Sequence, residues 1–160
     1  MAHRLCIVIV PALAALAVAV GGCGSQEAAA RARLVAQADP ICKQVYASRL
    51  AANATLPNSL TVTLGALQAL ARVAPGVAAY QHQAVDRLRT LKAPASLAHA
   101  WQEMLAGMQQ LADDTTQLGL DAKAKDIKDT QLVISSGRAL RKRLTVIAAR
   151  DGFAYCGRTS

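Results

Sequence analysis

The sequence has few aromatic and few acidic residues. One Trp, three Tyr and one Phe occur among 160 residues, and 18 Lys and Arg outnumber 10 Asp and Glu, which gives a net charge of +8. After the first 22 positions, Val and Ile do not alternate with polar residues, so the pattern that marks half-buried strands is missing. The chain is instead rich in Ala and Leu, which favour helices. Composition therefore predicts an all-α fold.

The sequence also lacks the patterns that mark catalytic and metal centres. There is no nucleophile–base–acid spacing, no Cys-x-x-Cys pair and no Glu-x-x-His motif of the kind found in di-iron bundles. We therefore expect no catalytic residue, no cofactor and no enzyme activity.

Only one long apolar run is present, at residues 5–20, and it follows the positive charge of Arg4. This order is typical of a secretory signal. The run ends in Val20-Gly21-Gly22-Cys23, which resembles the lipobox of bacterial lipoproteins. That resemblance implies acylation of the Cys23 thiol and cleavage just before it. A plain secretory signal and an uncleaved anchor are the alternatives.

The resemblance implies a domain organisation and a location. We expect a signal peptide at 1–22, a lipidated Cys23 with a tether to residue 38, a helical domain at 39–156 and a short tail at 157–160. The expected location is the extracytoplasmic face of the cell membrane, with the bilayer as a partner through Cys23. The expected role is a binding or interaction module of the cell envelope.

The apolar periodicity predicts four helices. The first begins at Asp39, a favourable N-cap, with Pro40 at the first helical position. Pro75 lies inside the second and predicts a kink there, although two shorter helices are the alternative. The expected ranges of the last three helices are 59–91, 95–120 and 126–150. Short turns between them predict an up-down-up-down four-helix bundle.

Four cysteines can be assigned by elimination. Cys6 lies in the signal and Cys23 would carry lipid, so Cys42 and Cys156 remain to pair in an oxidising compartment. In a four-helix bundle the start of the first helix and the end of the fourth lie at the same end, which suits this bond. The segments around Cys42 and Cys156 loosely resemble small uncharacterised exported helical proteins of bacteria, a resemblance that implies no activity.

Two histidines each have an acidic residue four positions further on, His82 with Asp86 and His99 with Glu103. Each pair can share one helix face. Because the two helices are predicted neighbours, the four residues could form a metal site, and the protein could be a metal or cofactor carrier. The alternative is two solvated pairs on the helix surfaces.

The fourth helix is strongly basic, with Arg138, Arg141, Lys142 and Arg143 close together. They could bind anionic lipid, a wall polymer or an acidic envelope protein, whereas export argues against nucleic acid. The alternative is that these charges only keep the domain soluble. Trp101, Met104 and Met108 have core spacing in the third helix, so we expect core packing rather than a haem or lipid pocket.

Overall fold

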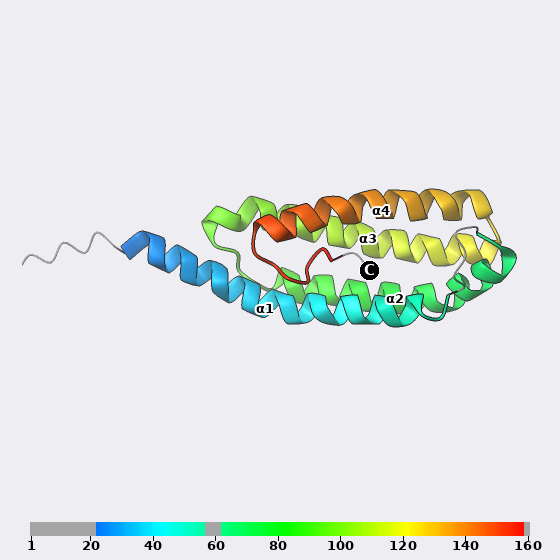
Figure 1. The fold of residues 1–160 in the computed structure, drawn as a ribbon, viewed down its shortest axis with the longest axis horizontal. Helices are drawn as coiled ribbons and strands as arrows, with labels where there is room; N and C mark the ends of the chain where they lie inside the picture. The colour runs from blue at the N-terminus through cyan, green and yellow to red at the C-terminus, as the bar shows by residue number, and fades with distance from the viewer. Residues whose placement is uncertain (1–21, 57–61, 159–160) are drawn as a thin grey trace, which may run out of the picture.

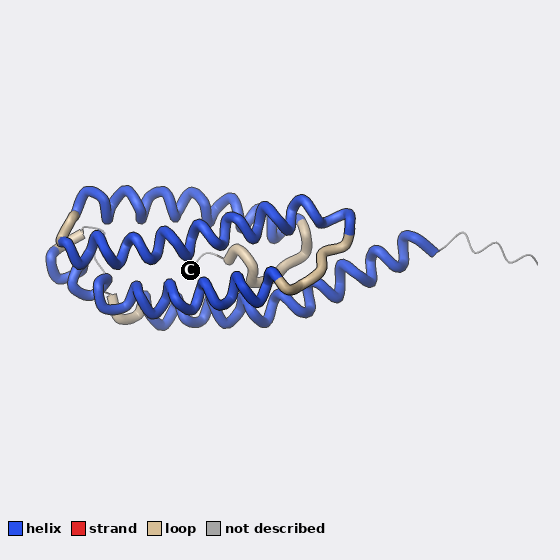
Figure 2. Tube along the Cα trace, turned by 180° about the vertical axis from the view of Figure 1, so that it is seen from behind, coloured by secondary structure: helices blue, strands red, loops and turns tan. Residues whose placement is uncertain are grey.

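The computed structural model describes residues 22–56 and 62–158, with side chains from Gln26 onward. Residues 1–21 of the predicted signal peptide and the Cys23 side chain lie outside the described residues. Within the described part the fold is all-helical, without strands, and the helices run along the long axis of the molecule (Figures 1 and 2). The elements are α1 (Gly22–Asn53), α2 (Leu64–Arg89), the 3₁₀ helix η1 (Ala95–Leu97), α3 (Ala98–Ala124) and α4 (Ile127–Arg150). The prediction of a bundle of four helices agrees with this arrangement.

The helix α1 continues through Asp39 and Pro40, so the prediction that the first helix begins at Asp39 was wrong. Pro40 is exposed, and water can therefore satisfy the carbonyl group whose helical hydrogen bond proline removes. Leu34 and Ala38, which were assigned to the tether, are fully buried in the core. Their burial favours continuation of the helix on the N-terminal side of the proline.

The ends of the other helices follow from local capping. The side chains of Thr63 and Asp126 accept hydrogen bonds from Ala66 N and Asp129 N, which caps the start of α2 and of α4. Lys125 adopts a left-handed conformation (φ 62°) after α3. The third helix therefore extends four residues further toward the C-terminus than predicted, to Ala124, and includes most of the expected loop before Asp126, while 95–97 form η1 instead of its first turn.

Pro75 lies inside α2, which remains one helix. The alternative of two shorter helices at this position is therefore wrong. Pro75 is exposed, like Pro40. None of the described helices has a stretch both long and apolar enough to cross a membrane.

The hydrophobic core occupies the half of the bundle around the disulfide. Trp101 is 3% exposed and stacks on Phe153, with ring centroids 5.6 Å apart. Met104 is buried beside them and Met108 packs against the same cluster, so the expected core packing of these residues is confirmed. The other large members of the cluster come from all four helices and from η1: Leu34, Ile41, Val45, Leu88, Leu97, Leu105 and Leu144.

The structure joins Cys42 to Cys156, the predicted pair, with Cα atoms 4.9 Å apart. Cys156 belongs to the segment 151–158, which follows α4 and turns back between α4 and α1 (Figure 1). Asp39 holds this segment, because its carboxylate accepts hydrogen bonds from Ala154 N and Tyr155 N at 2.9 and 3.0 Å. Asp39 therefore caps a distant segment rather than the start of its own helix.

The same segment ends close to α4 and α1. Gly157 has φ +99°, and a Cβ there would lie 2.6 Å from the carbonyl oxygen of Leu144, so only glycine fits. The carbonyl group of the next residue, Arg158, accepts a hydrogen bond from Arg49 of α1. The segment therefore fills the space between the first and last helices as far as Arg158.

Candidate functional site

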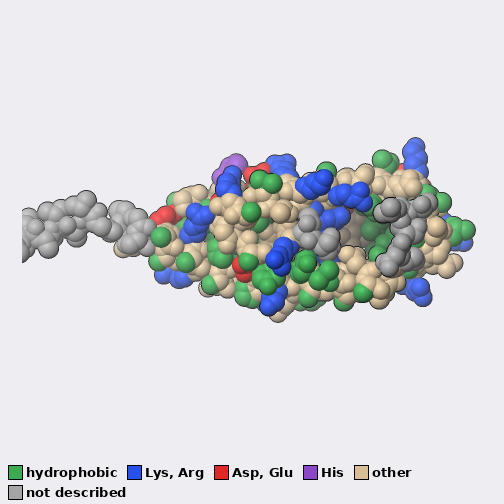
Figure 3. All heavy atoms as spheres, viewed as in Figure 1, with side chains coloured by type: hydrophobic (Ala, Val, Ile, Leu, Met, Phe, Trp, Pro, Cys, Tyr) green, Lys and Arg blue, Asp and Glu red, His purple; other side chains and the backbone are tan. Residues whose placement is uncertain are grey.

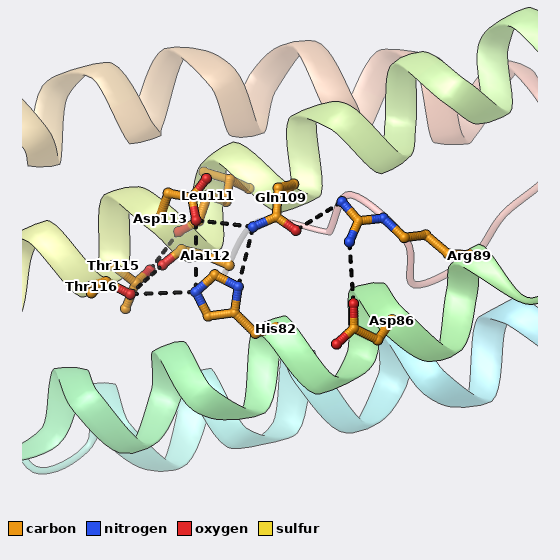
Figure 4. Close-up of polar contacts among 9 residues, drawn as sticks. All are labelled: His82, Asp86, Arg89, Gln109, Leu111, Ala112, Asp113, Thr115 and Thr116. Atoms are coloured by element: carbon orange, nitrogen blue, oxygen red, sulfur yellow. Dashed lines mark hydrogen bonds and ion pairs between the residues drawn. The ribbon is translucent and has the colours of Figure 1, made fainter.

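The predicted metal ligands do not come together in the structure. His82 faces α3, where its Nδ1 lies 3.2 Å from Gln109 Nε2 and its Nε2 lies 3.7 Å from Asp113 Oδ1 (Figure 4). Thr116 completes these contacts from the next turn of α3. The histidine thus belongs to a polar network on the surface of α2 and α3.

The two acidic residues of the predicted metal site have other partners. Asp86 accepts a hydrogen bond from Arg89, which also contacts Gln109 (Figure 4). Glu103 forms an ion pair with Arg143 of α4. In the described part of the chain, no three His, Cys, Asp or Glu side chains form a group that could hold a metal. The structure therefore does not bring the four predicted ligands together. His82 lies against Gln109, Asp113 and Thr116, and His99 is exposed. Asp86 and Glu103 pair with Arg89 and Arg143.

A large cavity lies in the half of the bundle away from the disulfide. Its volume is about 500 Å³, within the roughly 300–1,000 Å³ usual for small-molecule sites. Its walls come from the end of α1, the middle of α2, the second half of α3 and the middle of α4. The apolar residues among them are Ala52, Leu56, Leu70, Val73, Ala74, Val77, Leu118 and Ile134. The sequence had suggested no such cavity.

Four cations line this cavity: Arg49, Arg138, Arg141 and Lys142. We call the space lined by these cations and by the apolar walls the cationic cavity. None of the described residues that line it is Asp, Glu, His, Cys or Ser. In the space-filling view, Lys and Arg side chains gather around a hollow between α4 and α1, with hydrophobic atoms beside it (Figure 3). The cavity thus combines an apolar wall with positive charge.

The structure divides the predicted basic cluster in two. Arg138, Arg141 and Lys142 line the cationic cavity. Arg143 instead binds Glu103, with Nε donating to Oε1 at 3.1 Å. The rotation of 100° per residue along a helix explains this division, because neighbouring residues cannot all face one cavity.

Arg141 carries a charge that is held away from water. Its side chain is half-buried, and no described residue forms a hydrogen bond or ion pair with its guanidinium group. Burial and the like charge of Arg138 lower its pKa, while Asp114 opposes this shift. Burial and the charge of Arg141 lower the pKa of Arg49 to about 10. Partly desolvated like charges repel one another and attract an anion strongly.

Gln81 lies at the inner end of the cationic cavity. It is 9% exposed, and its Oε1 has no hydrogen-bond partner among the described residues. A second, smaller cavity of about 40 Å³ shares Arg49, Gln81 and Arg141 with the large one. A buried amide of this kind offers a polar contact to a ligand or to a bound water molecule.

Sequence reasoning missed Arg49 and Gln81. Gln81 lies four residues after Val77 and three before Ala84, so it fills a gap in the apolar stripe of α2. Arg49 likewise follows Val45 by four residues on the stripe of α1. A polar residue at an inward position is the signal that could have found both.

Asp114 is the acidic neighbour of Arg141, and it supplies a test of the local electrostatics. Burial is the main cause that raises the pKa of Asp114, with the charge of Asp113 as the second. A raised pKa means that Asp114 holds its proton more tightly in the folded state than in the unfolded state. Ionisation of Asp114 therefore lowers the free energy of unfolding at pH values above the folded-state pKa, and this loss is absent below the unfolded-state pKa. We expect Asp114→Asn to raise the free energy of unfolding at pH 7 by about 0.5 kcal/mol, discounted because the group is half-exposed.

The measurement is urea unfolding at pH 7 and at pH 3. The gain should disappear at pH 3, where Asp114 is protonated in both states. Asp86→Asn is the matched control, because Asp86 is exposed, accepts a hydrogen bond from Arg89 and does not contribute to the pKa shift of Asp114. A loss of stability in Asp114→Asn at pH 7 would show that Asp114 acts instead as a stabilising partner of Arg141.

Compared with family models, curated proteins and solved structures, the chain matches none of them.

Proposed function

We propose that this protein is a lipid-anchored lipoprotein on the extracytoplasmic face of the membrane, where its helical domain binds an anionic ligand in the cationic cavity. The anchor is supported by the sequence, in which Val20-Gly21-Gly22-Cys23 follows a positive start and an apolar run. The observation that carries the binding role is the half-buried guanidinium group of Arg141, which pairs with no described residue and lines a cavity of about 500 Å³.

A binding role accounts for the lining of this cavity better than catalysis does. Guanidinium groups recognise carboxylates and phosphates with paired N–H donors, and they stay protonated at physiological pH. General acid–base and nucleophilic chemistry is carried mostly by His, carboxylates, Cys and Ser, which the described lining lacks. The lining does include the Thr115 hydroxyl, but this group donates a hydrogen bond to the carbonyl group of Leu111, and no described lining residue is a His or carboxylate that could activate it. We therefore propose a binding module and not an enzyme.

We also propose that the helices alternate in direction and that α2 bends at Pro75. Alternation is supported by the short connection between α3 and α4 at Lys125–Asp126. It is also supported by the contacts of α1 with α2, because Gln44 accepts a hydrogen bond from Arg87, whereas the later residue Ala52 lines the cavity with the earlier residue Val73. The bend is supported by the missing hydrogen bond donor of Pro75. This arrangement gathers the four cations on one side of the cavity.

Thermal unfolding with inorganic phosphate tests whether the cavity binds anions. A ligand that binds only the folded state raises its Tm. We expect phosphate to raise the Tm of the wild type more than that of the double variant Arg138→Gln/Arg141→Gln. Phosphate also strengthens folding through exclusion from the protein surface, so the difference between the two proteins is the quantity to compare.

Arg72→Gln is the matched control for this experiment. Arg72 is exposed on α2 and is not among the residues that line the cavity, and its replacement removes the same charge. It should respond to phosphate as the wild type does. Equal responses from the wild type and the double variant would exclude the cationic cavity as an anion site.

A further inference from the structure

We propose that the ligand of the cationic cavity is a single-chain anionic amphiphile, of the fatty acid or lysophospholipid type, bound with its head at Arg138 and Arg141 and its chain along the apolar walls. This inference rests on the proposed function and adds the chemical class of the ligand. It comes from the division of the cavity into a charged side and an apolar side.

The charged side of the cavity recognises the head of such a ligand. Arg138, Arg141 and Lys142 come from two successive turns of α4, and Arg49 faces them from α1. Arg141 is half-buried, and no described residue pairs with its guanidinium group. A carboxylate or phosphate at this place would gain two or more charge-assisted hydrogen bonds and relieve the repulsion between the arginines.

The apolar side of the cavity exceeds what a small inorganic anion needs. Leu70, Val73 and Val77 of α2 lie across from Leu118 of α3 and Ile134 of α4, and all five line the same space. These side chains are only partly buried, although they sit inside the bundle. An acyl chain would cover this surface, with a gain in free energy for each buried methylene group.

The size of the cavity favours one chain over two. About 500 Å³ falls in the lower half of the range found for small-molecule sites. Small side chains open this space, because Ala52 and Ala74 occupy wall positions where Leu would fill it. The buried amide of Gln81 would then meet a polar atom of the ligand near its head.

The test measures binding of alkyl carboxylates to the full-length anchored protein in nanodiscs of zwitterionic lipid, against nanodiscs without protein. Hexanoate, octanoate, decanoate and dodecanoate form the series. We expect Kd to fall by up to about fourfold for each added methylene group until the apolar wall is covered. Dodecyltrimethylammonium, with the same chain and a positive head, should not bind.

Two pairs of variants separate the head from the chain. Arg138→Gln/Arg141→Gln should weaken dodecanoate binding by about tenfold or more, because it removes charge-assisted hydrogen bonds, whereas Arg72→Gln should bind as the wild type does. Val77→Trp should fill the apolar wall and weaken dodecanoate more than hexanoate. Val146→Trp is its control, since Val146 is 69% exposed on α4.

The outcomes distinguish this inference from the proposed function. If phosphate and hexanoate bind as tightly as dodecanoate and still require the arginines, the cavity is an anion site without an acyl chain and this inference is overturned, while the proposed function stands. If anionic lipid in the nanodisc alone reproduces the arginine-dependent effect, the cations act on the membrane surface, which also overturns it. A variant that ends at Arg158 should bind as the wild type does. If that variant binds dodecanoate and the wild type does not, the last residues of the chain occupy the cavity, and this inference is overturned.

Discussion

Replacing Cys23 by Ala is expected to release the protein from membranes or to block its processing. The lipobox-like segment Val20-Gly21-Gly22-Cys23 supplies one thiol for acylation, and each acyl methylene group buried in the bilayer contributes about 0.8 kcal/mol. No described helix could replace that anchor by crossing the membrane. The loss of the acyl group should therefore be the largest effect of any single substitution on location.

Membrane fractionation with mass spectrometry of the mature N-terminus measures this effect. The wild type should be found in the membrane fraction with an acylated Cys23, and Cys23→Ala should be found in the soluble fraction or as the uncleaved precursor. Cys6→Ala is the matched control, because Cys6 lies within the predicted signal. An unmodified Cys23 on mature wild-type protein would contradict the lipoprotein assignment.

The second large effect is expected from removing the disulfide. Cys42 and Cys156 are 114 residues apart, and chain-entropy models assign a crosslink across such a loop about 4–5 kcal/mol. Both residues are buried in the core, and the bond holds the segment 151–158 between α1 and α4. The double variant Cys42→Ala/Cys156→Ala should therefore lose most of this free energy of unfolding.

Urea unfolding with and without a reducing agent provides the measurement. The wild type should lose a similar amount of stability when it is reduced, and the double variant should not respond to reduction. If the wild type and the double variant unfold at the same urea concentration, the bond does not constrain the chain in the way proposed.

Several parts of the fold could be predicted because they depend on local patterns. The stripe through Trp101, Met104 and Met108 has the period of a helix, and it lies in or against the core. Asp151 and Gly152 stop α4, as glycine after a helix usually does. The disulfide was predicted by counting the cysteines that remain after the predicted signal and the predicted lipidation site are set aside.

Other features depend on distant partners and could not be predicted in this way. Asp39 resembles an N-cap in the sequence, but its carboxylate binds the backbone of Ala154 and Tyr155, more than a hundred residues away. Proline inside a helix carries a free-energy penalty, which favours ending the helix at Pro40. The burial of Leu34 in the core offsets this penalty, so the helix continues through the proline.

The site was predicted only in part, for a related reason. Basic residues of α4 were recognised from their number, but the sequence does not say which of them face inward. Arg141 lines the cavity while Arg143 binds Glu103 on another side of the helix. The space itself arises where small side chains from different helices meet, such as Ala52 and Ala74. Its existence therefore depends on the arrangement of the helices in space.

Native mass spectrometry of the protein isolated from its own membrane tests the central claim most directly. The cationic cavity is proposed to hold a single-chain anionic amphiphile, so the wild type should carry one bound molecule whose mass and fragments identify an acyl chain with a carboxylate or phosphate head. The Arg138→Gln/Arg141→Gln variant should have lost that molecule, and Arg72→Gln should retain it. A wild type without a bound amphiphile, or a molecule retained equally by all three proteins, would contradict the account.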